Sequence, residues 1–159
     1  MANYIYPAPG NAAAEATLTL YHTSNSDAAS LAVPSLQDIT VNASNDVFTW
    51  TQLDESAKKQ VATTATNSVT CNLVLEKDSF FGTTGSGGTT ATASGVMGLS
   101  IDKTIVYFEL YLGDESDGTN GKTISGEGYI TGLAPTVSAD APVWVSPVTI
   151  TVTGEYTIA

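Results

Sequence analysis

The chain has no arginine, and its five lysines face 16 acidic residues, so the formal net charge of its 159 residues is −11. Charged residues make up 13% of the sequence, about half the share found in ordinary soluble domains. Proteins that hold nucleic acid or an anionic membrane surface use cations to neutralise phosphates. The composition therefore disfavours both kinds of partner. A hydrophobic share of 42% is enough to bury the core of one domain, and disorder is disfavoured too.

Histidine and cysteine are almost absent, with one residue of each, His22 and Cys71. A single cysteine cannot form an internal disulfide, and one His with one Cys cannot build a structural zinc site. A catalytic triad would have to use His22, but no nucleophile motif lies near it. Cys71 falls on the apolar face of a strand pattern, where a cysteine is a small core residue. The sequence therefore predicts a protein that is not an enzyme and that has no catalytic residue, no cofactor and no metal site.

Two short motifs resemble ligand sites but do not satisfy their requirements. Gly121–Lys122–Thr123 looks like the end of a phosphate-binding loop, yet the glycine required five positions earlier is Ser116 and a strand pattern follows. The acidic segment 113–121 offers oxygen ligands for calcium, but its spacing does not fit the helical-hand loop, and an acidic turn is the favoured interpretation. Its candidate ligands are Asp114, Glu115, Asp117 and Asn120.

Carbohydrate binding, export and membrane insertion also lack their usual signals. Trp50 and Trp144 each lie in an apolar strand pattern, which predicts core or interface positions instead of a sugar site. The first 20 residues have no basic region followed by an apolar run, so no secretory signal is expected. No apolar stretch approaches the roughly 20 residues that a membrane span needs.

What the chain does contain is β pattern, because apolar and hydroxyl residues alternate over many short segments. Strands are expected at 16–22, 38–41, 47–51, 68–76 and 104–112, and a terminal hairpin at 122–158 with its turn at 134–142. One short helix is expected after Thr51, because Leu53, Ala57 and Val61 fall on one helical face. The predicted class is all-β, mainly antiparallel, in one domain spanning 1–159. We expect a β-sandwich or partial barrel with one short flanking helix and a long flexible loop.

Two segments lack a strand pattern, and from the residues alone each is either a functional segment or a connection without a role. Residues 82–95 form a low-complexity stretch without a large apolar side chain, which predicts the long flexible loop. Residues 1–10 carry Pro7, Pro9 and Gly10 and predict an N-terminal arm.

Three segments follow one another in a characteristic order. They are FTWTQLDESAKKQVATT at 48–64, VYFELYLG at 106–113 and GEGYITGLAPTVSADAPVWVSPVTITVTGEYT at 126–157. This order of elements, and the last segment most clearly, resembles the major tail tube protein of long-tailed (siphovirus-like) bacteriophages. The resemblance covers most of the chain by element order and about the final third by residues.

This resemblance implies a structural virion protein of the phage tail, made in the host bacterial cytoplasm. It implies homohexameric rings that stack into a tube through which DNA is ejected without specific binding. Tape measure, terminator and tail-tip proteins are the implied partners, with no membrane. The terminal hairpin 122–158 is the candidate for strands of the inner barrel. The candidate inter-ring contact loop is Gly82, Thr83, Thr84, Gly85, Ser86, Gly87, Gly88, Thr89 and Thr90, and the arm supplies Tyr4, Tyr6 and Pro7.

Two other functions fit the same composition. A capsid decoration or head-fibre protein is also β-rich, threonine-rich and unexported. A small carbohydrate-binding β domain is the third reading. The three functions differ in the assembly that they predict. A tube protein should form regular tubes, a decoration protein should bind to capsids, and a carbohydrate-binding domain should be a monomer with affinity for glycans.

Overall fold

The computed structural model describes residues 15–23, 29–34, 36–113, 121–140 and 142–159. These residues form seven strands and two helices, and every strand pairing is antiparallel, which confirms the all-β class. The elements are β1 (Thr17–Tyr21), β2 (Leu31–Ala32), β3 (Leu36–Thr51), β4 (Lys58–Val74), α1 (Lys77–Phe81), α2 (Ala91–Ile101), β5 (Val106–Leu112), β6 (Lys122–Leu133) and β7 (Val145–Ile158).

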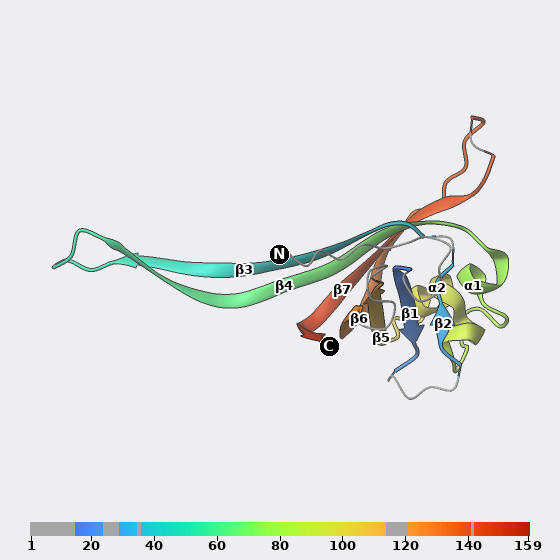
Figure 1. The fold of residues 1–159 in the computed structure, drawn as a ribbon, viewed down its shortest axis with the longest axis horizontal. Helices are drawn as coiled ribbons and strands as arrows, with labels where there is room; N and C mark the ends of the chain where they lie inside the picture. The colour runs from blue at the N-terminus through green and yellow to red at the C-terminus, as the bar shows by residue number, and fades with distance from the viewer. Residues whose placement is uncertain (1–14, 24–28, 35, 114–120, 141) are drawn as a thin grey trace.

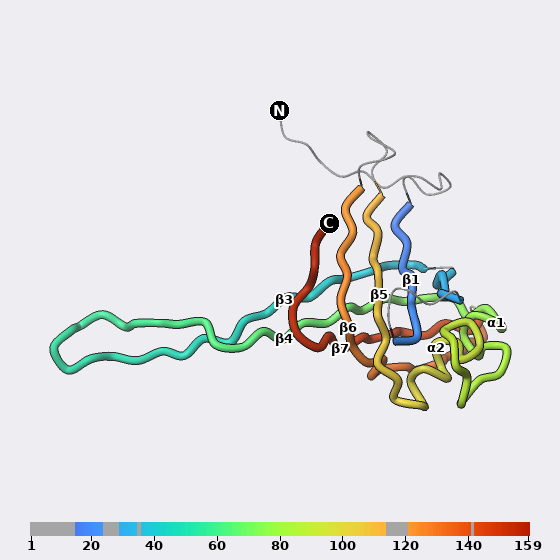
Figure 2. Tube along the Cα trace, turned by 90° about the horizontal axis from the view of Figure 1, so that it is seen from below, coloured from blue at the N-terminus to red at the C-terminus, as the bar shows by residue number. Residues whose placement is uncertain are grey.

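All seven strands belong to one sheet, in the order β2-β1-β5-β6-β7-β4-β3, and this sheet does not close into a barrel. In Figure 2 the strands β1, β5 and β6 run across β3, β4 and part of β7, so the sheet folds over and packs against itself. Two register shifts interrupt the β6–β7 ladder, at Ser125/Glu127 and Ile130/Gly132. Such bulges bend a strand and increase its twist, which allows one sheet to form both layers.

The core lies between the two layers of this folded sheet. Phe108 and Leu110 of β5 are buried side chains of one layer, and Val69 of β4 and Ile150 of β7 are buried side chains of the other. The predicted apolar faces of these strands are therefore confirmed, and so is the buried position of Cys71. The helices cover one end of the body, as Figure 1 shows, where α2 contributes Val96 and Leu99 to the core.

The helix predicted after Thr51 is wrong, because this segment forms the end of a long β-hairpin. β3 continues to Thr51 and β4 begins at Lys58, with Phe48 opposite Val61 and Thr51 opposite Lys58. The helical period rested on three positions only. Threonine and β-branched residues dominate the segment that follows, and they favour strands over helices. Leu53, expected on the apolar helix face, is fully exposed in the turn.

The loop predicted over 82–95 ends earlier, because α2 begins at Ala91. Thr90 caps this helix, and its hydroxyl oxygen accepts a hydrogen bond from the Ala93 backbone N–H at 3.2 Å. The absence of large side chains has a structural role here, since Gly82 and Gly95 adopt positive φ angles and their backbones touch. A Cβ on Gly95 would lie 2.3 Å from the Gly82 nitrogen. The flexibility of 82–90 stays a prediction.

Candidate assembly surfaces

The outer halves of β3 and β4 form a two-stranded ribbon that extends far from the body (Figures 1 and 2). β7 pairs with β4 only between Asn67 and Val74, so the ribbon at 43–51 and 58–66 has no third strand among the described residues. All of its side chains are exposed except Lys59, which is half-exposed. An isolated two-stranded hairpin is marginally stable in water, so a ribbon of this length favours a partner surface.

The base of the ribbon is fixed by Tyr156 of β7. Its hydroxyl lies 2.7 Å from the Asn42 carbonyl oxygen and 2.8 Å from the Ser68 carbonyl oxygen, and thus spans β3 and β4. The Asn67 side-chain amide donates to the Gly154 carbonyl oxygen at 2.8 Å. Burial raises the pKa of Tyr156, so the phenol stays neutral and donates. These bonds set the direction in which the ribbon leaves the body.

The outer end of the ribbon carries exposed apolar side chains, here called the hairpin patch. Alternation along β3 and the Phe48–Val61 register place Phe48, Trp50 and Val61 on one face. The Phe48 and Trp50 rings stack with centroids 5.8 Å apart, yet the two residues are 59% and 36% exposed. Trp50 is therefore not a core residue. The hairpin patch consists of Val47, Phe48, Trp50, Leu53 and Val61.

Polar contacts hold the shape of this outer end. The Lys59 ammonium lies 2.9 Å from the Glu55 carboxylate and donates to the Gln52 side-chain oxygen at 2.8 Å. The Thr64 hydroxyl donates to the Asp46 carboxylate at 2.9 Å, beside the register shift between Asn45 and Val47. The apolar side chains are thus presented by a hairpin whose turn is itself hydrogen-bonded.

The side of β1, β5, β6 and β7 that faces away from the core is polar, and we call it the outer face. The outward-facing residues of β6 and β7 pair across the ladder, with the Thr131 and Thr151 hydroxyl oxygens 2.8 Å apart. On the neighbouring strands the Tyr21 hydroxyl donates to the Glu109 carboxylate at 3.1 Å, and burial together with this carboxylate raises the pKa of Tyr21. The outer face consists of Thr19, Tyr21, Tyr107, Glu109, Glu127, Tyr129, Thr131, Thr149, Thr151 and Thr153. Its charged members are two glutamates.

The loop 82–90 lies beside the helices, at the other end of the long axis from the hairpin patch (Figure 1). Asp102, which caps the C-terminal end of α2, accepts hydrogen bonds from the Ser86 hydroxyl and the Gly87 backbone N–H, both at 2.6 Å. These two bonds lower the pKa of Asp102. The contact loop predicted from the sequence is thus tied to α2 at its middle.

A second apolar surface lies between α1 and the connection from β6 to β7. A groove of about 550 Å³ is lined there by Leu75, Phe81, Pro135, Val143 and Trp144. Trp144 is 52% exposed, so this tryptophan is not a core residue either.

No family model and no curated protein sequence matches the chain. Solved structures do match its fold. The tail of an empty gene transfer agent (GTA) particle, refined with C6 symmetry, superposes with a TM-score of 0.63 at 11% identity, over 89% of this chain and 95% of that one. The SPP1 tail tube gives 0.59 at 10% identity, over 89% and 76% of the two chains. The sheath–tube complex of the PVC extracellular contractile injection system gives 0.56 at 12% identity, over 97% and 92%.

The chain has the phage tail tube fold. The resemblance found in the sequence is thereby confirmed at the level of the fold. Within the tail tube fold, β6 and β7 pair antiparallel across the segment 122–158 in which the terminal hairpin is predicted. The arm residues Tyr4, Tyr6 and Pro7 lie outside the described residues, as do residues 114–120 of the acidic segment.

The hairpin patch is the surface that the sequence interpretation missed. Val47–Thr51 is predicted as a strand, but Leu53–Val61 is assigned to a helix, so the two halves of the ribbon are not recognised as partners. The signal is present in the sequence, since the polar run QLDESA at 52–57 separates two β-prone segments.

Cys71, the single cysteine, lies buried in the core. Burial raises the pKa of the Cys71 thiol to about 11, so it is a weak nucleophile at neutral pH. Across the described ranges, no group of three or more His, Cys, Asp and Glu side chains is placed to hold a metal ion. Neither α1 nor α2 is long and apolar enough to cross a membrane.

Proposed function

We propose that the chain is the repeating subunit of a phage tail tube, in which homohexameric rings stack around a channel for DNA. One observation carries this proposal: the tail tube fold extends a long ribbon whose exposed outer end is apolar. An exposed aromatic cluster costs solvation in a monomer and is typical of a contact surface. The role is structural, in the virion, and involves no catalysis.

The open sheet supports assembly as well. β3 and β2 are the two edge strands, and β3 pairs only with β4, so its other edge has no neighbouring strand within the part of the chain that the structure describes. Exposed edges invite pairing with other chains, and closure into a ring removes them. Six copies, each contributing strands of the same sheet, would complete a closed inner barrel.

The outer face fits the wall of a DNA channel. Its hydroxyl groups are hydrated without attracting phosphates, and Glu109 and Glu127 repel them. Affinity for DNA that is independent of sequence grows with the number of lysines and arginines that reach phosphates. A wall formed by this face would let DNA slide, which is the reason for assigning it to the lumen.

Contacts between rings are assigned to the hairpin patch and to the loop 82–90, which lie at opposite ends of the long axis (Figure 1). Such a heterologous contact joins different surfaces of successive subunits and can therefore repeat along a tube. In the assembled tube Tyr4, Tyr6 and Pro7 of the arm would add to these contacts. A terminator and a tail-tip complex would close the two ends, and a tape measure protein would fill the channel until ejection.

Negative-stain electron microscopy of the purified protein tests this proposal. Hollow tubes with a regular axial repeat, or six-fold rings, are expected.

The double variant Phe48→Ser/Trp50→Ser should stay folded but form neither long tubes nor ring stacks, because it removes the stacked pair from the hairpin patch. Thr49→Ser, on the opposite face of the same strand, is the matched control and should assemble normally. A wild-type protein that stays monomeric at high concentration, or binds only to capsids, would contradict the tube.

A further inference from the structure

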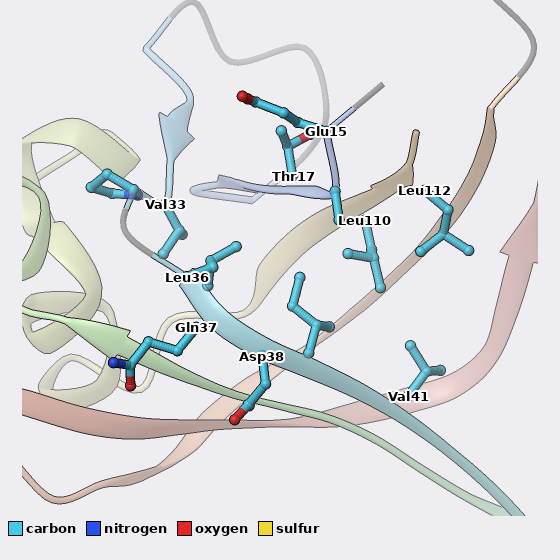
Figure 3. A pocket seen from close by; sticks show the side chains of 12 residues that line it. Glu15, Thr17, Val33, Leu36, Gln37, Asp38, Val41, Leu110 and Leu112 are labelled. Atoms are coloured by element: carbon cyan, nitrogen blue, oxygen red, sulfur yellow. The ribbon is translucent and has the colours of Figure 1, made fainter. Parts of the chain in front are cut away.

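The folded sheet leaves an apolar groove along its open seam, here called the seam groove. It has a volume of about 640 Å³ and lies between the first half of β3 and the strands β1 and β5. In Figure 3, Leu36 of β3 faces Leu110 and Leu112 of β5 across this space. The branched aliphatic side chains that line it are Val33, Leu36, Ile39, Val41, Leu110 and Leu112.

The seam groove is less completely covered than the core beside it. Leu36, Ile39, Val41 and Leu112 pack on the core but are only half-buried. Its volume falls in the range of roughly 300–1,000 Å³ that is usual for sites enclosing a small organic group. A groove of this size between aliphatic side chains suits one or two aromatic rings.

The chain itself supplies a candidate occupant, the segment of residues 1–14. It joins the body at Glu15, and Glu15 lines the seam groove. The aromatic residues of this segment are Tyr4 and Tyr6, and Pro7, Pro9 and Gly10 follow them, a composition that favours reversal of the chain. Eight residues lie between Tyr6 and Glu15, and the nine Cα–Cα steps span at most about 30 Å, so the tyrosines can reach back into the groove.

Charge favours the same occupant. The charged residues that line the seam groove, Glu15 and Asp38, are both acidic. Because acidic residues outnumber lysines 16 to 5 in the whole chain, these two carboxylates would repel most other segments of it. Residues 1–14 carry no charged side chain and can approach without that penalty.

We propose that in the free subunit, before any assembly, Tyr4 and Tyr6 occupy the seam groove of their own chain. In an extended segment these two residues point to the same side and Ile5 to the other, so both rings can enter together. A short tether gives an effective concentration in the millimolar range, which favours the chain's own segment over that of a neighbour in dilute solution. This docking is a property of the monomer and does not depend on tube formation.

Disulfide trapping in dilute, unassembled protein tests the proposal. In a Cys71→Ala background, Tyr6→Cys is combined with Val41→Cys, which faces the seam groove. The matched control combines Tyr6→Cys with Thr40→Cys, whose side chain is exposed on the opposite side of β3. At about 1 µM protein under mild oxidation, an intrachain link to position 41 is expected to form at least about tenfold faster than to position 40, since burying an aromatic ring is worth more than 1.4 kcal/mol.

A third set of variants separates docking from simple tethering. Adding Tyr4→Ser to the position-41 pair should slow the link to the rate of the control, because it removes the remaining ring. Adding Ile5→Ser should leave the rate unchanged. Equal rates at positions 40 and 41 would overturn the proposal. Links that form mainly between chains would also overturn it, and would assign the groove to a neighbouring copy's segment. Neither result bears on tube formation, which microscopy tests separately.

Discussion

Small residues, not large apolar ones, determine how the two helices meet. Gly82 closes α1 and Gly95 lies at the kink of α2, both with positive φ, and each occupies the space where the other's Cβ would stand. Ser94, Gly95 and Gly98 are buried where the backbones of the two segments approach each other closely. A segment with no large side chain thus packs through its backbone, which the composition of residues 82–95 does not indicate.

Gly95→Ala is expected to destabilise the fold by about 2–4 kcal/mol, because the new methyl group would strain a positive φ and also clash with the Gly82 backbone. Gly87→Ala is the matched control, since Gly87 also has a positive φ but nothing lies within 4 Å of its Cβ position. The control should cost only about 1 kcal/mol. Urea unfolding measures both values, and equal costs would show that backbone contact at Gly95 is unimportant.

The strands of this chain could be predicted from the sequence because their side chains alternate between buried and exposed, whereas the helices lack such a period. β5 alternates Val106, Phe108 and Leu110 with polar residues, so its period identifies both the element and its buried face. The α2 sequence ATASGVMGLSI has no apolar stripe, because small residues contact other backbone on several sides. The hairpin patch was hidden because three apolar positions mimicked a helical period across a turn.

At the scale of the loop 82–90, Asp102 is the residue that fixes its conformation. Its pKa is lowered by hydrogen bonds from Ser86 and Gly87, so the folded form holds the proton less tightly than the unfolded chain does. The contact therefore contributes above the ordinary carboxyl pKa and is lost as pH falls through the lowered value. The Gly87 amide resonance should shift with that titration in NMR spectra.

Asp102→Asn should abolish the titration of the Gly87 amide and loosen the loop at every pH. If the loop contacts the next ring, this variant should form rings normally but shorter tubes, which electron microscopy counts directly. Lys103→Gln, at the neighbouring position, should have normal tubes. Tubes of full length despite a displaced Gly87 resonance would contradict the role of this loop in stacking.

At the scale of the whole molecule, the proposed tube would explain both the net charge of −11 and the long ribbon that extends from the body. The sheet buries its apolar side, presents a hydroxyl-rich outer face, and extends an apolar patch on a ribbon well beyond its own core. A monomer gains nothing from the last two features, whereas a subunit of the proposed ring would use one for the channel wall and the other for contacts with its neighbours. In the proposed tube, the scarcity of cations would follow from the position of this face beside DNA.

Lysines placed on the outer face test whether this surface lines the channel. Thr151→Lys/Thr153→Lys would add two cations per subunit, and twelve per proposed ring, to a face whose charged members are Glu109 and Glu127. Tubes of this variant should retain double-stranded DNA at low salt, and retention should fall steeply as salt rises, because each phosphate neutralised adds about 0.9 to the salt slope. Ejection through such tubes should be slowed. A matched variant, Thr63→Lys/Thr66→Lys on the ribbon, adds the same charge away from the wall. Retention by the ribbon variant alone, or by neither variant, would place this face outside the channel.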